Sequence, residues 1–416
     1  MWLSQLALVN FRNLASLRLE PQPGVLLFSG RNGQGKTNLL ESVYVLATTR
    51  SPRTSIEREL LSWSIPTDAA LAAVLVPFAR LEARVRRLAG ETHLELTFEG
   101  ERSPVAPNGE ASATGSSTSG PVSRGIKVNG LPTRASGLVG QLPVVYFSPG
   151  DVELAGGPPA GRRQYLNLAN SQASPSHMRA LQRYNRVLLQ RNQVLRLVRE
   201  RRQPPSALDP WTEQMVDLGS HVLSQRLTML RQVDDRVVSI FRDLAGSTET
   251  LHIAYRSTAY GAEAGGETPE QAELVQAFRE RQERLASREI DQAVTLVGPH
   301  RDDFSFMLDG VDLNRFGSRG QQRLAVLALK LAEADWMHAQ IGELPVVLLD
   351  DVLSELDPQR RQYVLQRVAA PEPTHQRQVW ITSTEPVEIA ATSSSIYEVL
   401  STAQRYEIDA GQVRPA

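Results

Sequence analysis

The sequence contains no cysteine, very few lysines and no long apolar run, and these absences exclude several classes of protein. Without cysteine, the chain cannot form a disulfide, a cysteine-ligated zinc site or a thiol nucleophile. No run of 18 apolar residues occurs, and the start MWLSQLALVNFR lacks a basic segment followed by a cleavage site. We therefore expect a cytoplasmic protein with no membrane contact.

The charges of the chain nearly cancel, so its total charge favours no particular partner. The formal net charge is −1, from 45 basic and 46 acidic residues. Only Lys36, Lys127 and Lys330 are lysines, and all other basic residues are arginines. Nucleic-acid binding depends on clustered cations rather than on totals, so any basic face must be local.

The 416 residues suffice for two or three domains, and the order of patterns indicates their division. Strand patterns around one helix fill the first third, helical patterns follow, and alternating strands and helices return at the end. We predict an α/β fold: a head domain built from both ends of the chain, residues 1–157 and 290–416, with a helical arm domain, residues 158–289, inserted. The Ser-, Gly- and Pro-rich residues 103–125 predict a disordered loop within the head.

Short patterns predict individual strands, turns and helix starts. The segments SQLALVNFR and SLRLEP favour a strand pair, RLEARVRRLAG and ETHLELTFEGE a hairpin, and Asn129 with Gly130 a tight turn. The apolar segments GVLLFSG, LPVVLLDD and RQVWITSTEP favour buried strands. In SELDPQRR, Asp357 and Pro358 predict a helix N-cap and first residue.

Residues 30 to 37, GRNGQGKT, fit the phosphate-loop pattern G-x-x-x-x-G-K-[ST] between a predicted strand and a predicted helix. The glycines let backbone N–H groups point at phosphate oxygens, the lysine reaches the β- and γ-phosphates, and the threonine hydroxyl can bind Mg²⁺. The alternative is a Gly-rich turn that fits by chance. The predicted nucleotide-binding residues are Gly30, Arg31, Asn32, Gly33, Gln34, Gly35, Lys36, Thr37 and Asn38.

Two aspartates end the apolar segment PVVLLDD. A buried strand there places Asp350 beside the phosphate loop, so we predict Asp350 and Thr37 as Mg²⁺ ligands. Asp351 is the candidate that orients and polarises an attacking water, and with Lys36 it is a predicted catalytic residue. The alternative is that both carboxylates merely cap the next helix.

The segment FGSRGQQRLAVLALKLAEADW, residues 316 to 336, predicts a helix with an unusual start. A first turn usually carries acidic residues, whereas this one offers a hydroxyl, a guanidinium, amides and backbone N–H groups. These groups together suit an anion. The predicted anion-binding residues are Ser318, Arg319, Gly320 and Gln321.

In chain order, a phosphate loop, an S-x-G-Q helix start, an apolar strand ending in DD and an ELD loop look like the ATPase head shared by ABC transporters, SMC proteins and the RecF family. The RecF family is the closer match. The resemblance is carried, between residues 8 and 357, by LVNFRNL, NGQGKTNLLESVYVL, GPPAGRRQYLN, YNRVLLQRN, GPHRDDF, FGSRGQQR and LLDDVLSELD.

The resemblance implies an ATP-binding head with weak ATPase activity, in which ATP and Mg²⁺ bring two heads together on duplex or junction DNA. It also implies that Ser318, Arg319, Gly320 and Gln321 of one subunit approach the γ-phosphate held by the other subunit. The implied partners are a second copy of the chain, RecR and RecO, and indirectly the recombinase RecA, in recombinational repair and replication.

Three positions depart from the wider superfamily. Ser148, Pro149 and Gly150 follow the strand VVYF where a glutamine sensor is expected. Ser383 and Thr384 stand where the superfamily usually has a switch histidine, and Asp351 stands where most relatives have glutamate. These departures favour a slow switch over a fast pump.

Residues 177 to 203, HMRALQRYNRVLLQRNQVLRLVRERRQ, carry eight arginines and one acid, Glu200. Arginines along a helix can follow a phosphate backbone without reading bases, which the RecF resemblance favours here. The alternative is a solvated face whose arginine stems cover apolar neighbours. The predicted DNA contacts are Arg162, Arg163, Arg186, Arg191 and Arg196.

Other functions fit parts of the pattern. An SMC-like head needs hundreds of heptad residues between the phosphate loop and the S-x-G-Q helix, and the helical middle is too short. An ABC-type motor subunit of a transporter needs a docking surface for membrane helices and usually keeps the switch histidine. The segment GPHRDDF lacks a metal ligand set, so we expect its charges to pair locally before a strand.

Overall fold

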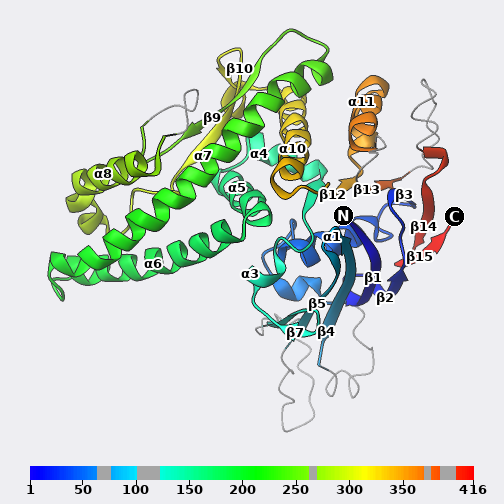
Figure 1. The fold of residues 1–416 in the computed structure, drawn as a ribbon, viewed down its shortest axis with the longest axis horizontal. Helices are drawn as coiled ribbons and strands as arrows, with labels where there is room; N and C mark the ends of the chain where they lie inside the picture. The colour runs from blue at the N-terminus through cyan, green and yellow to red at the C-terminus, as the bar shows by residue number, and fades with distance from the viewer. Residues whose placement is uncertain (63–75, 101–121, 262–268, 370–375, 385–399) are drawn as a thin grey trace, which may run out of the picture. The chain divides into compact units, whose positions relative to one another are not determined.

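A computed structural model of the chain describes residues 1–62, 76–100, 122–261, 269–369, 376–384 and 400–416. The chain divides into two compact units (Figure 1). We call residues Met1–Pro149 with Ile341–Ala416 the sheet unit, and residues Gly150–Gln340 the helical unit.

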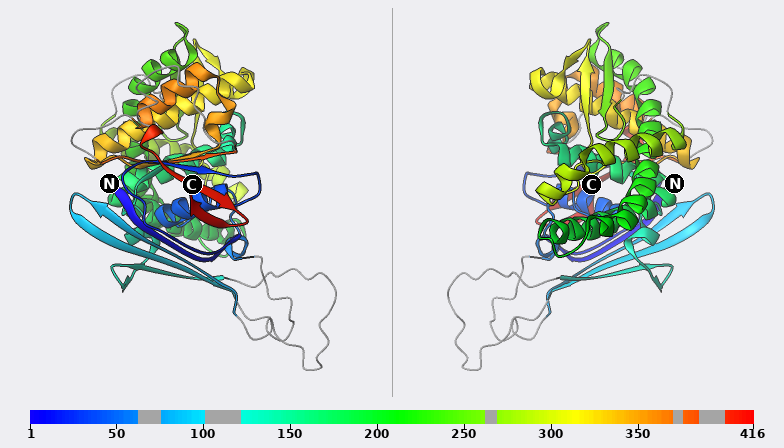
Figure 2. Two further views of the ribbon diagram at one scale, coloured as in Figure 1. Left: turned by 90° about the vertical axis from the view of Figure 1, so that its right-hand side faces the viewer. Right: turned by 90° about the vertical axis from the view of Figure 1, so that its left-hand side faces the viewer.

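The first sheet of the sheet unit is antiparallel and buries one face. In β4, the alternate residues Ala79, Leu81, Ala83 and Val85 are buried, as the period of two requires for a sheet with one covered face. Figure 2 shows β4 and β5, in light blue, running side by side. In spatial order the strands are β2 (Leu14–Leu19), β1 (Trp2–Phe11), β4 (Phe78–Arg87), β5 (Gly90–Gly100), β6 (Val122–Val128) and β7 (Leu131–Pro132).

The second sheet of this unit has a parallel centre. Its strands β3, β13, β12 and β8 are buried almost throughout, which explains their continuous apolar runs. Because these strands are parallel, their carboxyl ends meet at one edge. In spatial order the strands are β15 (Gln412–Pro415), β14 (Gln404–Asp409), β3 (Gly24–Ser29), β13 (Gln378–Ser383), β12 (Val346–Asp350) and β8 (Val144–Phe147).

Helix α1 (Lys36–Thr48) lies between the two sheets and contacts strands of both (Figure 1). Its residues Leu39, Leu40, Val43 and Leu46 are fully buried in the core that the sheets share. The helix that carries the phosphate loop is therefore anchored on two sides. The other helices of the sheet unit are η1 (Glu57–Leu60), α3 (Ala135–Leu138), η4 (Val352–Glu355) and α11 (Pro358–Ala369).

The helical unit is built on long helices that pack along one another, α6, α7 and α8 (Figure 1). Ser174 caps α6 by accepting a hydrogen bond from the His177 N–H, and α7 ends at Gly246 with a left-handed backbone, φ 63°. The elements are η2 (Pro149–Val152, which starts at the unit boundary), α4 (Glu153–Gly156), α5 (Pro159–Ala173), α6 (Pro175–Arg199), η3 (Pro205–Leu208), α7 (Asp209–Ala245), β9 (Leu251–Arg256), α8 (Gln271–Gln292), β10 (Asp303–Leu308), β11 (Val311–Asp312), α9 (Leu313–Phe316) and α10 (Arg319–Ile341).

Most local predictions are confirmed. Strands β1 with β2 and β4 with β5 pair antiparallel, and Asn129 and Gly130 form the turn between β6 and β7 with φ of 52° and 78°. The GPHRDDF segment leads into β10, as expected. Among the described residues, no helix has the length and apolar character needed to span a bilayer.

The predicted loop at residues 103–125 falls mostly outside the described residues, but Val122 to Gly125 begin β6. The predicted boundary at 289/290 also differs from the structural division, because β10 pairs with β9 and Trp336 of α10 donates to Gln232 of α7. Residues 290–340 thus group with the helical unit. The functional division into head and arm stays a prediction.

Candidate functional site

The phosphate loop follows β3 and is shaped by its glycines. Gly30, Gly33 and Gly35 all have positive φ, of 152°, 79° and 118°, which side chains disfavour. A Cβ on Gly30 would lie 2.3 Å from the Ile408 carbonyl oxygen, and one on Gly35 would lie 2.8 Å from Asn13 Oδ1. The loop therefore requires glycine both for its backbone and for the segments packed against it.

Lys36 is the first residue of α1, and its side chain folds back onto the loop. The ammonium donates to the carbonyl oxygens of Gly30 and Arg31, the latter at 2.9 Å. Burial lowers the pKa of Lys36, while the carboxylates of Asp351 and Asp350 oppose this shift. The loop thus holds a mostly buried cation beside two acids.

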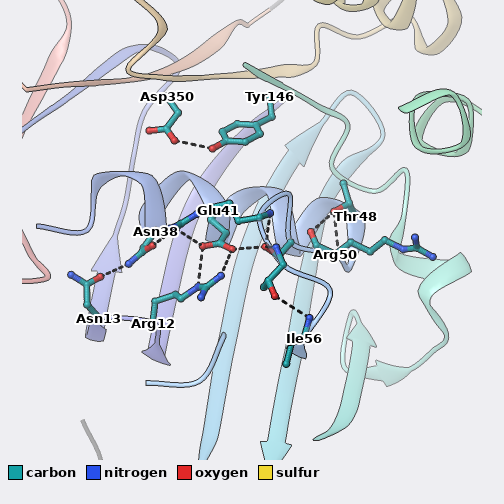
Figure 3. A network of polar contacts seen from close by, with 12 residues as sticks. Arg12, Asn13, Asn38, Glu41, Thr48, Arg50, Ile56, Tyr146 and Asp350 are labelled. Carbon is teal, nitrogen blue, oxygen red and sulfur yellow. Dashed lines mark hydrogen bonds and ion pairs between the residues drawn. The ribbon is translucent and has the colours of Figure 1, made fainter. Parts of the chain in front are cut away.

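Asp350 ends β12 and is held by three hydroxyl groups. Its Oδ1 accepts from Thr37 Oγ1 at 3.1 Å and from Thr382 Oγ1 at 2.9 Å, and its Oδ2 accepts from the Tyr146 hydroxyl at 2.9 Å. Figure 3 shows Tyr146 pointing at this carboxylate. The structure thus brings together Thr37 and Asp350, which the sequence predicts as Mg²⁺ ligands. Tyr146 and Thr382 were not predicted as partners of Asp350, because only the parallel order of β8, β12 and β13 places them beside its carboxylate.

Burial gives Asp350 a testable effect on stability. It raises the pKa of the carboxyl above the ordinary value of 3.8, although the hydrogen bonds from Tyr146, Thr382 and Thr37 oppose the rise. A carboxyl whose folded-state pKa is raised contributes stability that is complete below the unfolded pKa and is lost as pH rises through the folded pKa.

We therefore expect Asp350→Asn, which buries no charge, to raise the unfolding temperature of the nucleotide-free protein at neutral pH. The gain over the parent protein should shrink as pH falls toward 3.8. Calorimetric unfolding over a pH series measures this. The control is Asp357→Asn, because asparagine caps a helix as well as aspartate does. A lower unfolding temperature for Asp350→Asn at neutral pH would contradict the argument.

Asp351 has a left-handed backbone, φ 53°, which is uncommon for a residue with a side chain. Its N–H donates to Thr382 Oγ1 at 3.0 Å. Its Oδ1 is buried and, in the part of the chain that the structure describes, has no hydrogen-bond partner. It makes no cap to the following η4, whereas Asp357 does cap α11 through the Arg360 N–H. Simple capping therefore does not account for Asp351, and its catalytic role stays a prediction.

A polar network behind the loop was not predicted (Figure 3). Asn13 Nδ2 donates to the Gln34 carbonyl oxygen at 3.0 Å, and Asn13 Oδ1 accepts from Asn38 Nδ2 at 2.8 Å. Arg53 donates to Asn38 Oδ1 at 2.8 Å, so both the nitrogen and the oxygen of the Asn38 side-chain amide form hydrogen bonds within the chain. Asn38 therefore supports the loop, and the structure gives no support to its predicted contact with nucleotide.

The same network ends in a buried ion pair. Glu41 is fully buried, and Arg12 donates to both of its carboxylate oxygens, at 2.8 and 3.1 Å. Ser51 and Arg53 also donate to Glu41. In the sequence, Arg12 and Asn13 follow the strand pattern of LVNFRNL. That pattern does not identify their hydrogen-bond partners, which lie in another part of the chain.

The start of α10, in the helical unit, is a capping box. Ser318 Oγ accepts from the Gln321 N–H at 3.2 Å, and Gln321 Oε1 accepts from the Ser318 N–H at 3.0 Å. The cap occupies the backbone N–H groups of Ser318 and Gln321, which were predicted to be among the groups that suit an anion, and the S-x-x-Q spacing is the pattern that predicts such a cap. The anion-binding role of this turn stays a prediction. The Arg319 guanidinium nitrogen Nη1 lies 3.8 Å from Glu153 Oε1, and both side chains are largely exposed. A Cβ on Gly320 would meet no atom within 4 Å, so the chain itself does not require glycine there.

Two of the five predicted DNA contacts are wrong, because their side chains are buried. Arg162 donates to both carboxylate oxygens of Asp303, at 2.6 and 2.9 Å, and Arg191 donates to Glu289 at 2.7 Å. Arg162 is 4% exposed and Arg191 2%. Buried charges need partners, so these guanidiniums serve the fold and do not face a phosphate backbone.

The other three predicted contacts differ in exposure. Arg163 is partly buried and donates to the Asp302 carbonyl oxygen at 3.1 Å, and burial lowers its pKa. Arg186 and Arg196 are exposed on α6. Only these last two present open guanidiniums, and their contact with DNA stays a prediction.

Comparison with known proteins covers the whole chain. The family model described as RecF/RecN/SMC N terminal domain matches residues 2–407. The chain is 38% identical over 420 residues to the DNA replication and repair protein RecF of Chloroflexus aurantiacus, with 99% of each covered. It is 39% identical to the protein of the same name from Herpetosiphon aurantiacus, with 100% of each covered.

Solved structures give a consistent result. A structure of the recombination mediator protein RecF with ATP, in the RecFOR pathway, matches with 28% identity, a TM-score of 0.81, and coverage of 100% of this chain and 97% of that chain. The Smc head domain from Pyrococcus furiosus, at 12% identity and a TM-score of 0.50, shares the fold alone. The chain also has the phosphate loop and the apolar strand that ends at Asp350, in an α/β fold of this kind. It belongs to the RecF family.

Proposed function

We propose that the chain is an ATP-dependent DNA-binding protein of recombinational repair and replication. ATP brings two copies together on DNA, and slow hydrolysis releases them. The observation that carries this proposal is the pairing of Thr37 with Asp350 beside Lys36, in a chain similar along its whole length to RecF proteins. The alternative of a transporter motor has no comparable support.

In the proposed reaction, the backbone N–H groups of the loop hold the phosphates of ATP, and Lys36 exchanges its loop carbonyls for the β- and γ-phosphates. The Thr37 hydroxyl and the Asp350 carboxylate, 3.1 Å apart, are oxygen donors that fit Mg²⁺. When bound, this ion supplies charge neutralisation on the phosphates. Tyr146 and Thr382 orient the Asp350 carboxylate. Asp351, with its unpaired Oδ1, orients the attacking water.

We further propose that the start of α10 recognises the γ-phosphate held by a second copy. The Ser318 hydroxyl and the Gln321 side-chain NH2 then donate to phosphate, while their oxygens accept from the backbone N–H groups of the cap. The open space at Gly320 allows a close approach. ADP lacks this phosphate, so only ATP favours the paired state through differential contacts.

DNA, RecR and RecO, and indirectly RecA, are the proposed partners. The solved RecF structures are described within the RecFOR pathway, which supports RecR and RecO. The exposed arginines of α6 support contact with a phosphate backbone that is independent of sequence.

The function is tested by salt-dependent DNA binding with and without ATP. We expect binding to require ATP, and Arg186→Gln with Arg196→Gln to lower the slope of log affinity against log salt by about two units, similarly for unrelated duplexes. Fluorescence anisotropy with labelled duplex and gapped DNA measures this. The control replaces Arg231 and Arg279, exposed in the same unit, by glutamine.

Two results would count against these claims separately. A parent protein that binds DNA equally with and without ATP contradicts the ATP-dependent function. A parent that binds with ATP, while the Arg186 and Arg196 variant matches its control, contradicts only the contacts from α6.

A further inference from the structure

The helical unit contains a cavity lined by cations. The cavity has a volume of about 650 Å³ and lies between α8 and the turn that follows β9. Arg281, Arg284 and Arg288 line it from α8, and Ser257 and Thr258 line it from the turn. Because the three arginines are separated by three and four residues, they lie on one face of the helix.

These arginines are not neutralised in the part of the chain that the structure describes. None of the three makes an ion pair there, and the Nε of Arg284 donates only to the Glu280 carbonyl oxygen, at 3.3 Å. The neighbouring Glu289 is fully buried and paired with Arg191. All three arginines are exposed, so within the described residues their guanidiniums are open to an anion from solution, which their shared positive charge attracts.

The turn on the other side adds a hydrogen-bond donor. Ser257 Oγ accepts from the N–H groups of Ala259 and Tyr260, at 3.2 and 3.0 Å. Its own proton has no acceptor within the described residues. Thr258, by contrast, donates its hydroxyl to Asp302 at 2.8 Å. The cavity thus offers three guanidiniums and one free hydroxyl donor.

We propose that this cavity binds the phosphodiester backbone of a nucleic acid, through Arg281, Arg284, Arg288 and Ser257. The inference rests on the proposed function and adds a DNA contact that lies outside α6. Arg281 and Arg288 are seven positions apart on the helix, a rise of roughly 10 Å. Along the axis of a duplex this distance corresponds to about three phosphate steps of one strand, at about 3.4 Å each.

The paired N–H donors of a guanidinium match phosphate and carboxylate oxygens alike. A phosphodiester is favoured over the carboxylates of an acidic protein partner because the chain is proposed to bind DNA, and serine hydroxyls commonly supplement arginine contacts to the DNA backbone. A second backbone contact on the same unit would extend that function. An acidic peptide and free phosphate are the two ligands to be separated by experiment.

The test uses the full chain with Arg281, Arg284 and Arg288 all replaced by glutamine. Its matched control replaces Arg231, Arg242 and Arg279, which are exposed in the same unit outside the cavity. With ATP and labelled gapped DNA, the cavity variant should lose two to three units of salt slope, since each phosphate contact contributes about 0.9. Its affinity should fall about tenfold or more. The control should keep the parent slope, and both variants should dimerise with ATP as the parent does.

Each other outcome has a defined meaning. If the parent protein binds no DNA, both the proposed function and this site are overturned. If the parent binds and the cavity variant equals the control, the site alone is overturned. If the cavity variant keeps its DNA binding but loses binding of poly-glutamate or of inorganic phosphate, the cavity serves another anion and the phosphodiester assignment is wrong.

Discussion

Lys36→Ala is expected to abolish ATP-dependent dimerisation and to weaken ATP binding by at least about a hundredfold. Two charge-assisted hydrogen bonds to phosphate are lost, each contributing about 1.5–3 kcal/mol. The fold should remain, because within the described residues the ammonium donates only to the carbonyl oxygens of Gly30 and Arg31, which water can satisfy. Calorimetric titration measures the affinity, and sedimentation with ATP or ADP measures dimerisation.

The chain offers a matched lysine for this experiment. Lys127→Ala removes the same charge from the sheet unit at an exposed strand, where Lys127 pairs with Glu95 at 3.0 Å. We expect Lys127→Ala to bind ATP and dimerise like the parent protein. Unchanged dimerisation of Lys36→Ala would refute the proposed role of the loop.

The second large effect is complementation between two inactive subunits. We expect Ser318→Arg to block the start of α10 from a partner's nucleotide while leaving its own phosphate loop intact, and Lys36→Ala to do the reverse. Each variant alone should be inactive. In a covalently linked pair of the two, one composite site has both defects and the other has none, so part of the ATPase activity should return.

The control pair links the parent chain to a chain carrying both substitutions. This pair has no intact composite site, although one chain is undamaged, so it should be inactive. An active control pair with an inactive complementing pair would show that the loop and α10 act within one chain. Because a Cβ on Gly320 meets no other atom, Gly320→Ala repeats the test without removing the Ser318 cap.

The sequence alone determined the elements of the proposed nucleotide site. The motif GRNGQGKT between a strand and a helix, and the apolar run ending at Asp350, are local patterns that a short segment encodes. The pairing of Thr37 with Asp350 followed from them, because parallel strands meet at their carboxyl ends. Glycine spacing in the loop is likewise a property of the local backbone.

Only the tertiary structure decided which polar groups are free. Arg162 and Arg191 look like Arg186 in the sequence, yet they pair with acids 141 and 98 residues away and are buried. Asn13 and Tyr146 gain their roles from partners on other elements. A cation's availability depends on burial and on its neighbours in space, which long-range packing sets. The helix pattern places Arg281, Arg284 and Arg288 on one face, but only the fold sets a serine opposite that face and leaves the three arginines without an ion pair among the described residues.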